Sequence, residues 1–423
     1  MKTNVYYTLI VLFFLVSCQS KENTDKKESY INPKSLTMEL KNGNWFNGNT
    51  FEKKTAWVRN GILSFENKNE LNDTIINLKG KYVIPPFAEA HNHNLESAFQ
   101  LEKRINSYLK NGVFYVKQLS SIKKQIDPLM HHYNKPNGID ISMAHAPLTA
   151  TGGHPVALRE WFLESGWFEG LFDTLDDIES HGFFTIDNQN DLENKWSHIL
   201  SFKPDFIKIM LLHSEEYEKR KNDTTFFGKK GLNPALVPII VKKAHENNLR
   251  VSAHVETAHD FHVAVKSGVD EIAHFPEIFN GNIVPREDVV LARKKNTVVT
   301  TTISLINRKK EDSLYTDLLD NIKQNLKIFK EEKVTLAIGS DMFNDNSVGE
   351  FQLLYDLNIF SNLELLKMWV ENAAKTTLPN RNIGHLQEGF EASFLVLDSD
   401  PLADIREINN SIVLKVKQGE ILE

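Results

Sequence analysis

Strand-like and helix-like segments alternate over residues 82–340, and this alternation is the strongest constraint on the fold. Helix-like segments with apolar residues at a spacing of 3.6 lie between several of the strands, for example over residues 235–247 and 351–374. Eight βα repeats predict an α/β fold, a parallel (β/α)8 TIM barrel, with functional side chains at the carboxyl ends of the strands. The eight expected strands are residues 82–91, 113–118, 139–146, 206–210, 251–255, 271–275, 298–303 and 336–340.

The two ends of the chain have a different pattern. Near the start, short apolar runs are separated by Asn47-Gly48 and Asn60-Gly61, which are typical of tight hairpin turns. Strand-like runs also lie close to the carboxyl terminus. We therefore expect a small β-sandwich domain built from both termini, residues 36–80 plus 385–423, with the barrel inserted between them as residues 81–384.

The first 35 residues predict export. An apolar run over residues 5–16 follows Met1-Lys2, and as a helix it would rise about 18 Å, less than the hydrocarbon core of a bilayer. This length is typical of a signal peptide, residues 1–17. Leu15-Val16-Ser17-Cys18 resembles a bacterial lipobox, whose cysteine carries the lipid; a cleaved signal with an incidental cysteine is the alternative.

These features predict an exported bacterial lipoprotein, anchored in the membrane through a lipid on Cys18 and facing the periplasm or the cell surface. Residues 18–35 are rich in Lys, Glu, Asn and Ser and would form a flexible tether. Cys18 is the single cysteine, so the chain has no internal disulfide. The net charge of −7, from 49 basic and 56 acidic residues, argues against nucleic acid as a partner.

Metal-ligating residue types stand at the ends of five expected strands. Alternate residues of a strand share a face, so the first two histidines would project side by side. Neutral imidazoles and a carboxylate are common metal ligands. The residues concerned are His91 and His93 after the first strand, Lys208 within the fourth, His254 after the fifth, His274 after the sixth and Asp341 after the eighth.

Each of these residues alone has a simpler explanation. His254 or His274 could be a hydrogen-bonded core histidine, Asp341 could end a turn or cap a helix, and Lys208 could extend its amine to solvent. Taken together, however, these simpler explanations would require that five strand ends carry metal-ligand residue types by accident. The joint pattern therefore favours a metal site.

This set resembles the amidohydrolase superfamily of metal-dependent hydrolases. Its pattern is His-x-His after strand one, Lys after strand four, His after strands five and six, and Asp after strand eight. The resemblance covers about residues 60–406. The chain departs from the pattern at three places. Pro85-Pro86 stands where Pro-Gly is usual, Glu89 where Asp is usual, and Ala392-Ser393 where Ala-Asp is usual.

The resemblance implies a binuclear site with two divalent ions, in our prediction Zn²⁺. His91, His93 and Asp341 would hold one ion, His254 and His274 the other, and an N-carboxylated Lys208 would bridge them. Carboxylation needs a neutral amine. Burial in an apolar strand and nearby cations lower a lysine pKa, which supplies that form.

The implied activity is hydrolysis of a carbon–nitrogen bond in a small-molecule substrate: an amide, a cyclic amide or a dipeptide. A metal-bridging hydroxide would attack, and Asp341 would move the proton. Gly152-Gly153-His154 resembles a substrate-binding segment of imidazolonepropionase and prolidase-like members, so His154 is a further candidate. His145 and His213 are weaker candidates, and His131-His132 is expected on the surface.

Two alternatives remain open. A mononuclear deaminase or imidazolonepropionase-like enzyme is disfavoured by Lys208 and by an acid at Glu256, two residues after His254 rather than three. A non-catalytic ligand-binding lipoprotein is disfavoured because no position of the ligand set is missing.

Overall fold

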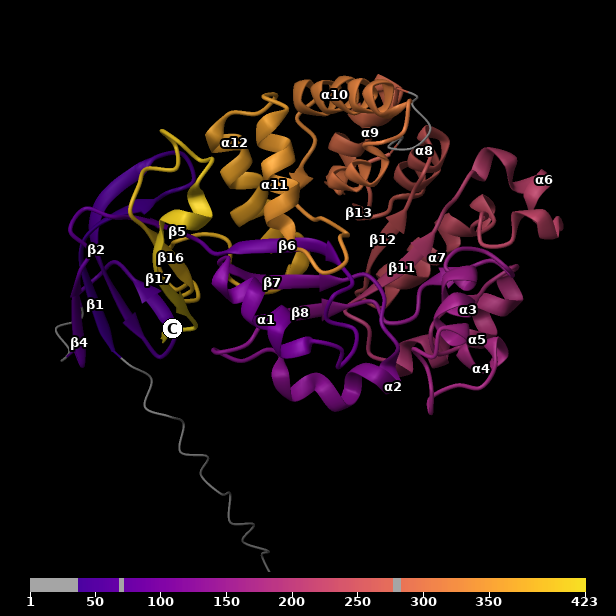
Figure 1. Cartoon of the computed structure of the whole chain (residues 1–423), viewed down its shortest axis with the longest axis horizontal. Coiled ribbons are helices and arrows are strands. Elements are labelled where there is room, and N and C mark those ends of the chain that lie inside the picture. Colours follow the sequence, from indigo (N-terminus) through magenta and orange to yellow (C-terminus); the bar gives the residue numbers. More distant parts are fainter. Residues whose placement is uncertain (1–36, 68–71, 277–282) are drawn as a thin grey trace, which may run out of the picture. The chain divides into compact units, whose positions relative to one another are not determined.

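The computed structural model describes residues 37–67, 72–276 and 283–423 (Figure 1). The predicted signal peptide, Cys18 and the tether lie outside these residues. Within them parallel strands alternate with helices, which confirms the α/β class. In this part of the chain, no helix is both long enough and apolar enough to cross a bilayer.

The parallel strands form two sheets. The first contains β6 (Phe87–Asn92), β7 (Val113–Gln118) and β8 (Asp140–Met143). The second has the order β10 (Phe184–Thr185), β9 (Leu148–Thr149), β11 (Phe206–Met210), β12 (Arg250–His254), β13 (Glu271–Ile272), β14 (Val298–Thr300), β15 (Leu336–Ala337).

Backbone hydrogen bonds join the first sheet to the chain after β15. Ala90 donates to the carbonyl of Ile338 at 3.0 Å, and Asp341 donates to the carbonyl of His91 at 2.8 Å. These bonds bring the chain that follows the last parallel strand against β6. A single closed eight-stranded barrel stays a prediction.

The expected first strand, residues 82–91, is wrong as one element. It forms two strands, β5 (Tyr82–Ile84) and β6, which belong to different sheets. Pro85-Pro86 separates them, because proline has no N–H to donate to a sheet ladder. The prediction also missed the two-residue strands β9 and β10.

Both ends of the described chain contribute to one mixed sheet (Figure 1). β5 pairs in parallel with β1 and antiparallel with β16, so segments more than 300 residues apart lie side by side. The strands form one hydrogen-bonded sheet, and a two-layered sandwich and the domain boundaries stay predictions. The order is β18 (Glu420–Leu422), β17 (Ile412–Lys417), β16 (Phe394–Leu397), β5, β1 (Met38–Phe46), β2 (Phe51–Arg59) and β3 (Ile62–Ser64), with β4 (Thr74–Asn77) beside β1.

Helices connect and flank the parallel strands (Figure 1). They are α1 (Leu101–Lys110), α2 (Lys123–Ile126), α3 (Val156–Glu164), α4 (Leu175–Ile178), α5 (Gln189–Ser201), α6 (Tyr217–Arg220), α7 (Val237–Glu246), α8 (Ala258–Ser267), α9 (Arg286–Lys295), α10 (Tyr315–Glu331), α11 (Ser347–Asp356), α12 (Asn362–Lys367) and α13 (Ala373–Thr377).

The helix expected over residues 351–374 is broken. α11 ends at Asp356, and Asn358 adopts a left-handed conformation with φ 53°. Ser361 then begins α12 with a capping box, in which its Oγ accepts from Glu364 N and Glu364 Oε2 accepts from Ser361 N at 2.7 Å. Apolar periodicity continues through this break and does not reveal it.

Trp369 is the centre of the packing between α11, α12 and β6. It lies in a π-helical turn, Met368–Asn372, and is fully buried. Its ring stacks on Phe87 with a centroid distance of 3.9 Å and on Phe351 at 4.5 Å. Its indole Nε1 donates to Ser347 Oγ at 2.9 Å, so the polar atom is satisfied as well.

Trp369→Ala is expected to lower the free energy of unfolding by about 3–5 kcal/mol, because it removes a buried aromatic ring and leaves a cavity. Denaturant unfolding measures this change. Trp161→Ala is the matched control, since Trp161 is 54% exposed and its loss should change the value by no more than about 0.5 kcal/mol. Equal effects of the two substitutions would contradict this account of the core.

Candidate active site

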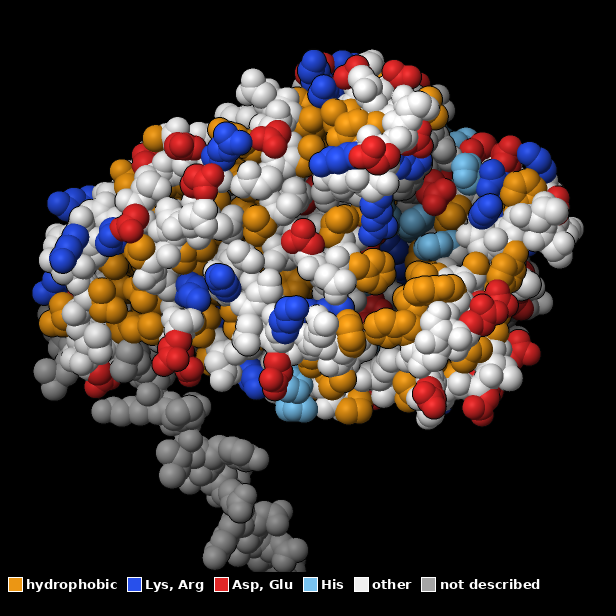
Figure 2. Space-filling view, in the orientation of Figure 1, with side chains coloured by type: hydrophobic (Ala, Val, Ile, Leu, Met, Phe, Trp, Pro, Cys, Tyr) orange, Lys and Arg blue, Asp and Glu red, His pale blue; other side chains and the backbone are white. Residues whose placement is uncertain are grey.

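A cavity of about 320 Å³ lies at the carboxyl ends of the parallel strands. Figure 2 shows histidine side chains in a hollow of the surface, with apolar side chains along its rim. All seven predicted site residues line this cavity: His91, His93, His154, Lys208, His254, His274 and Asp341. Residues from six separate segments of the chain therefore meet at one place.

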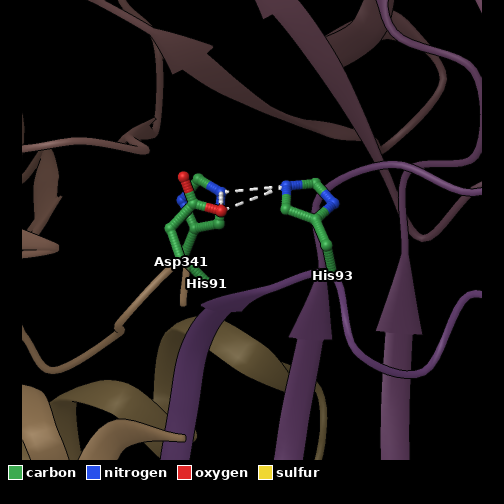
Figure 3. Close-up of side chains that lie close together, drawn as sticks. All are labelled: His91, His93 and Asp341. Carbon is green, nitrogen blue, oxygen red and sulfur yellow. Dashed lines mark hydrogen bonds and ion pairs between the residues drawn. The ribbon is translucent and has the colours of Figure 1, made fainter. Parts of the chain in front are cut away.

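His91, His93 and Asp341 point toward one another (Figure 3). Asp341 Oδ1 lies 3.5 Å from His91 Nε2 and 3.4 Å from His93 Nε2, and the two imidazole nitrogens are 3.4 Å apart. Ligand atoms of the three side chains all lie within 4.8 Å of one another. One cation could therefore take a ligand atom from each of them.

The other basic residues lie next to this triad. The His274 ring is 4.4 Å from His91 and 4.5 Å from His254, centroid to centroid, and His274 Nδ1 is 3.8 Å from Asp341 Oδ2. Lys208 comes from the middle of β11 and is buried. Four imidazoles and one amine thus surround a single triad carboxylate.

Burial sets the protonation of this cluster. It lowers the pKa of His91 and of His274 well below the usual range, and neighbouring basic groups lower both further. It lowers the pKa of Lys208 to about 7. Burial also lowers the pKa of His93, but the carboxylates of Glu96 and Asp341 together offset this and the net pKa is raised. Burial raises the pKa of Asp341.

The donor set fits a metal ion. Imidazole nitrogen and carboxylate oxygen are ligands that zinc takes in proteins. Within the described ranges, Lys208 Nζ and His254 Nε2 are buried without a hydrogen-bond partner, and His254 Nε2 lies 3.6 Å from its nearest carboxylate, Glu256. Buried polar atoms without a partner are costly, and coordination would satisfy them.

Hydrogen bonds fix the orientation of the first two histidines. His91 Nδ1 donates to the carbonyl of Ala273 at 2.7 Å, which turns Nε2 toward the cluster. His93 Nδ1 pairs with Glu96 Oε1, which also accepts from Ser120 Oγ at 3.2 Å. Our sequence analysis missed Glu96 and Ser120; the position of Glu96, three residues after His93, was the available signal.

Glu89 holds the two strand ends that carry the triad. Its carboxylate is fully buried, and it accepts from Ser340 N at 2.7 Å, from Ser340 Oγ at 2.9 Å and from His91 N at 3.3 Å. Burial raises the pKa of Glu89 to about 8. A Cβ on Gly339 would lie 2.6 Å from His91 N, so only glycine allows this close approach.

The remaining candidates divide into two groups. His154 lines the cavity and stacks on His254 with centroids 5.0 Å apart, and burial lowers its pKa to about 3. His145 is not among the lining residues and shares a hydrogen bond of 2.9 Å with Ser121 Oγ. His213 is also absent from the lining, and its Nε2 lies 3.4 Å from Glu256, which does line the cavity. His131-His132 is away from the cavity.

Residues 204–422 match the model of the Amidohydrolase family. The chain belongs to this family. The match covers more than half of the chain, and it confirms the superfamily predicted from the strand-end residues. Lys208, His254, His274 and Asp341 all fall within the matched segment of this amidohydrolase.

Known proteins similar to this amidohydrolase include an ochratoxinase from Aspergillus niger, 25% identical over 186 residues. That alignment covers 41% of this chain and 38% of the fungal protein. The crystal structure of A. niger ochratoxinase has a TM-score of 0.71 at 17% identity, covering 91% of this chain and 95% of the other. The crystal structure of a prolidase in complex with N-methylphosphonate-L-proline has a TM-score of 0.71 at 19% identity. The alignment covers 92% of this chain and 100% of the prolidase. These structures share the fold.

The buried amine predicts a pH-dependent stability. Because the pKa of Lys208 is about 7 in the folded protein and about 10.4 in an unfolded chain, the unfolded state binds an extra proton between these values. The free energy of unfolding should therefore rise with pH across this window.

Lys208→Met should flatten that rise by up to about 1.4 kcal/mol per pH unit. The measurement is denaturant unfolding from pH 7 to 10, on metal-free protein in buffer free of carbon dioxide. Lys242→Met is the control, since the Lys242 side chain is 78% exposed and its loss should leave the slope unchanged. A wild-type slope equal to that of Lys208→Met would show that the amine is not held neutral.

Proposed function

We propose that this protein is a metal-dependent amidohydrolase that hydrolyses a carbon–nitrogen bond in an amide, a cyclic amide or a dipeptide. The observation that carries the proposal is the crowding of His91, His93, His254, His274 and Lys208 around Asp341 in one cavity. Family membership supports it, as does the shared fold with a prolidase and an ochratoxinase. The two parallel sheets would form one (β/α)8 barrel.

The site would hold two divalent ions, with zinc as the candidate. His91, His93 and Asp341 would bind one, and His254 and His274 the other. Lys208 would bridge them as an N-carboxylated lysine, since its buried amine has no hydrogen-bond partner within the described residues and a pKa of about 7. When bound, such ions make water acidic enough to supply hydroxide near neutral pH and polarise a carbonyl.

Asp341 is the residue placed to move the proton. Its carboxylate faces the cavity, and its backbone N–H is held by the His91 carbonyl at 2.8 Å. As general base it would take the proton of the attacking water, and as general acid it would deliver this proton to the leaving nitrogen. His154, held neutral by burial, lies on the adjacent wall and would donate a hydrogen bond to the substrate.

A lipid on Cys18 would anchor the enzyme to a bacterial membrane, with residues 18–35 as the tether, facing the periplasm or the cell surface. The lipobox-like Leu15-Val16-Ser17-Cys18 supports this part of the proposal.

Metal content tests the site. Purified protein loaded with zinc and desalted should carry about two ions per chain by elemental analysis, since the two ligand sets are separate. Chelation should abolish hydrolysis, and zinc should restore it. About one ion per chain would contradict the binuclear site. Two ions with no turnover of dipeptides, N-acyl amino acids, cyclic amides or lactones would contradict the enzyme and favour a binding protein.

Asp341→Asn should lower kcat by about 10²–10⁴, because an amide cannot carry the proton. The comparison is made at equal metal content, so that loss of a ligand is not mistaken for loss of the base. Asp356→Asn, on the exposed end of α11, is the matched control and should keep wild-type kcat. Unchanged kcat in metal-loaded Asp341→Asn would exclude the proton-transfer role.

A further inference from the structure

Helix α3 presents one face to the cavity. Pro155, Leu158, Arg159 and Phe162 all line it, at positions i, i+3, i+4 and i+7. This spacing places them on one side of a helix. The wall that α3 forms is therefore apolar, except for one guanidinium.

Arg159 has fewer partners than a buried cation requires. Its side chain is 4% exposed, and it donates from Nη2 to Ser120 Oγ at 3.0 Å. Its Nε is buried without an acceptor, and within the described ranges Glu96 acts on the guanidinium through space rather than through a direct ion pair. An arginine remains charged in a protein, so burial without a direct ion pair is costly, and a bound anion would lower that cost.

Ser120 connects Arg159 to a carboxylate, that of Glu96, but this carboxylate already has other partners. Glu96 pairs with His93 Nδ1 and accepts from Ser120 Oγ. Arg308 also lines the cavity and acts electrostatically on Asp341, but its side chain is exposed to solvent. Arg159 is the more deeply buried of these two cations, so a bound anion would offset a larger desolvation cost there.

The position of Arg159 relates it to the candidate metal centre. Ser120 Oγ, which accepts from Arg159, also lies 3.3 Å from His93 Nδ1. The guanidinium is therefore two hydrogen-bond lengths from a predicted ligand. If Arg159 bound the carboxylate of an amino-acid residue, the amide bond to the α-nitrogen of that residue would lie close to the predicted ions.

We propose that Arg159 binds the carboxylate of the substrate and that Leu158 and Phe162 contact the apolar side chain next to it. The preferred substrates are then N-acyl amino acids, or dipeptides cleaved before an apolar carboxyl-terminal residue. Figure 2 shows further apolar side chains along the rim of the hollow. This inference rests on the proposed function, and it narrows the substrate class.

The test uses a matched pair of compounds, N-acetyl-L-phenylalanine and N-acetylphenethylamine, which differ only in the carboxylate. Zinc-loaded wild type should hydrolyse the first with kcat/KM at least about 100-fold above the second, as expected for a charge-assisted contact. Arg159→Met should lower the first value by about 100-fold and leave the second within about threefold. Arg159→Lys should recover part of the loss, since it keeps the charge without the bidentate geometry.

Calorimetric titration of metal-free protein gives a readout independent of turnover. The Kd for N-acetyl-L-phenylalanine should rise in Arg159→Met, and that for N-acetylphenethylamine should not. If wild type binds selectively but hydrolyses nothing, the proposed function fails and the carboxylate site stands. Hydrolysis of both compounds at equal rates would overturn the inference and leave the proposed function intact.

Two further outcomes would overturn the assignment of the carboxylate site to Arg159. Equal losses on both compounds in Arg159→Met would mean that Arg159 positions His93 through Ser120 and Glu96. A selective loss in Arg308→Met, with none in Arg159→Met, would assign the carboxylate site to Arg308 instead. Thermal melting checks that each variant is folded. If Arg159→Met does not fold, Arg159→Lys takes its place, and a wild-type kcat/KM ratio in this variant would overturn the inference.

Discussion

Electrostatic crowding at the end of the parallel strands is the constraint on which this site depends. Four imidazoles and an amine line one cavity with Asp341, so they cannot all be protonated without strong repulsion. Burial resolves this by favouring the neutral forms of His91, His274 and Lys208. Neutral nitrogens that point at one another repel through their lone pairs, and a bound cation reverses that effect. The same burial therefore removes protons and creates a preference for metal.

A rigid frame has to hold this crowded arrangement, and Glu89 is central to it. It links the end of β6 to the chain after β15, because it accepts hydrogen bonds from both His91 and Ser340. Ser340 is 251 residues away from Glu89 along the chain. The longer side chain, where the family commonly has aspartate, still reaches both partners. With Gly339 allowing close approach, the two segments that carry the triad become one unit. The hydrogen bonds from His91 to Ala273 and from His93 to Glu96 then set the direction of each ring.

The cavity has two kinds of wall. Strand ends supply the ligand-type residues, whose positions follow from the hydrogen-bonded sheets. The other lining residues come largely from α3 and from the segment after β14, which carry Arg159 and Arg308. Loops and helices after the strands can change without disturbing the sheet, and this is how one fold serves many substrates. In our proposals the chemistry belongs to the first wall and substrate choice to the second.

Local patterns in the sequence determined a large part of the fold and of the candidate site. Residues 113–118 and 206–210 are strands at the predicted bounds, because short runs rich in β-branched and aromatic residues need little context. The ligand-type residues were found because strand ends in a parallel fold share one edge. Only the tertiary structure decided that Pro85-Pro86 divides the first strand between two sheets, and that Arg159 and Ser120, 39 residues apart, meet beside His93. Those outcomes depend on contacts between distant segments, whereas periodicity and spacing describe only neighbours along the chain.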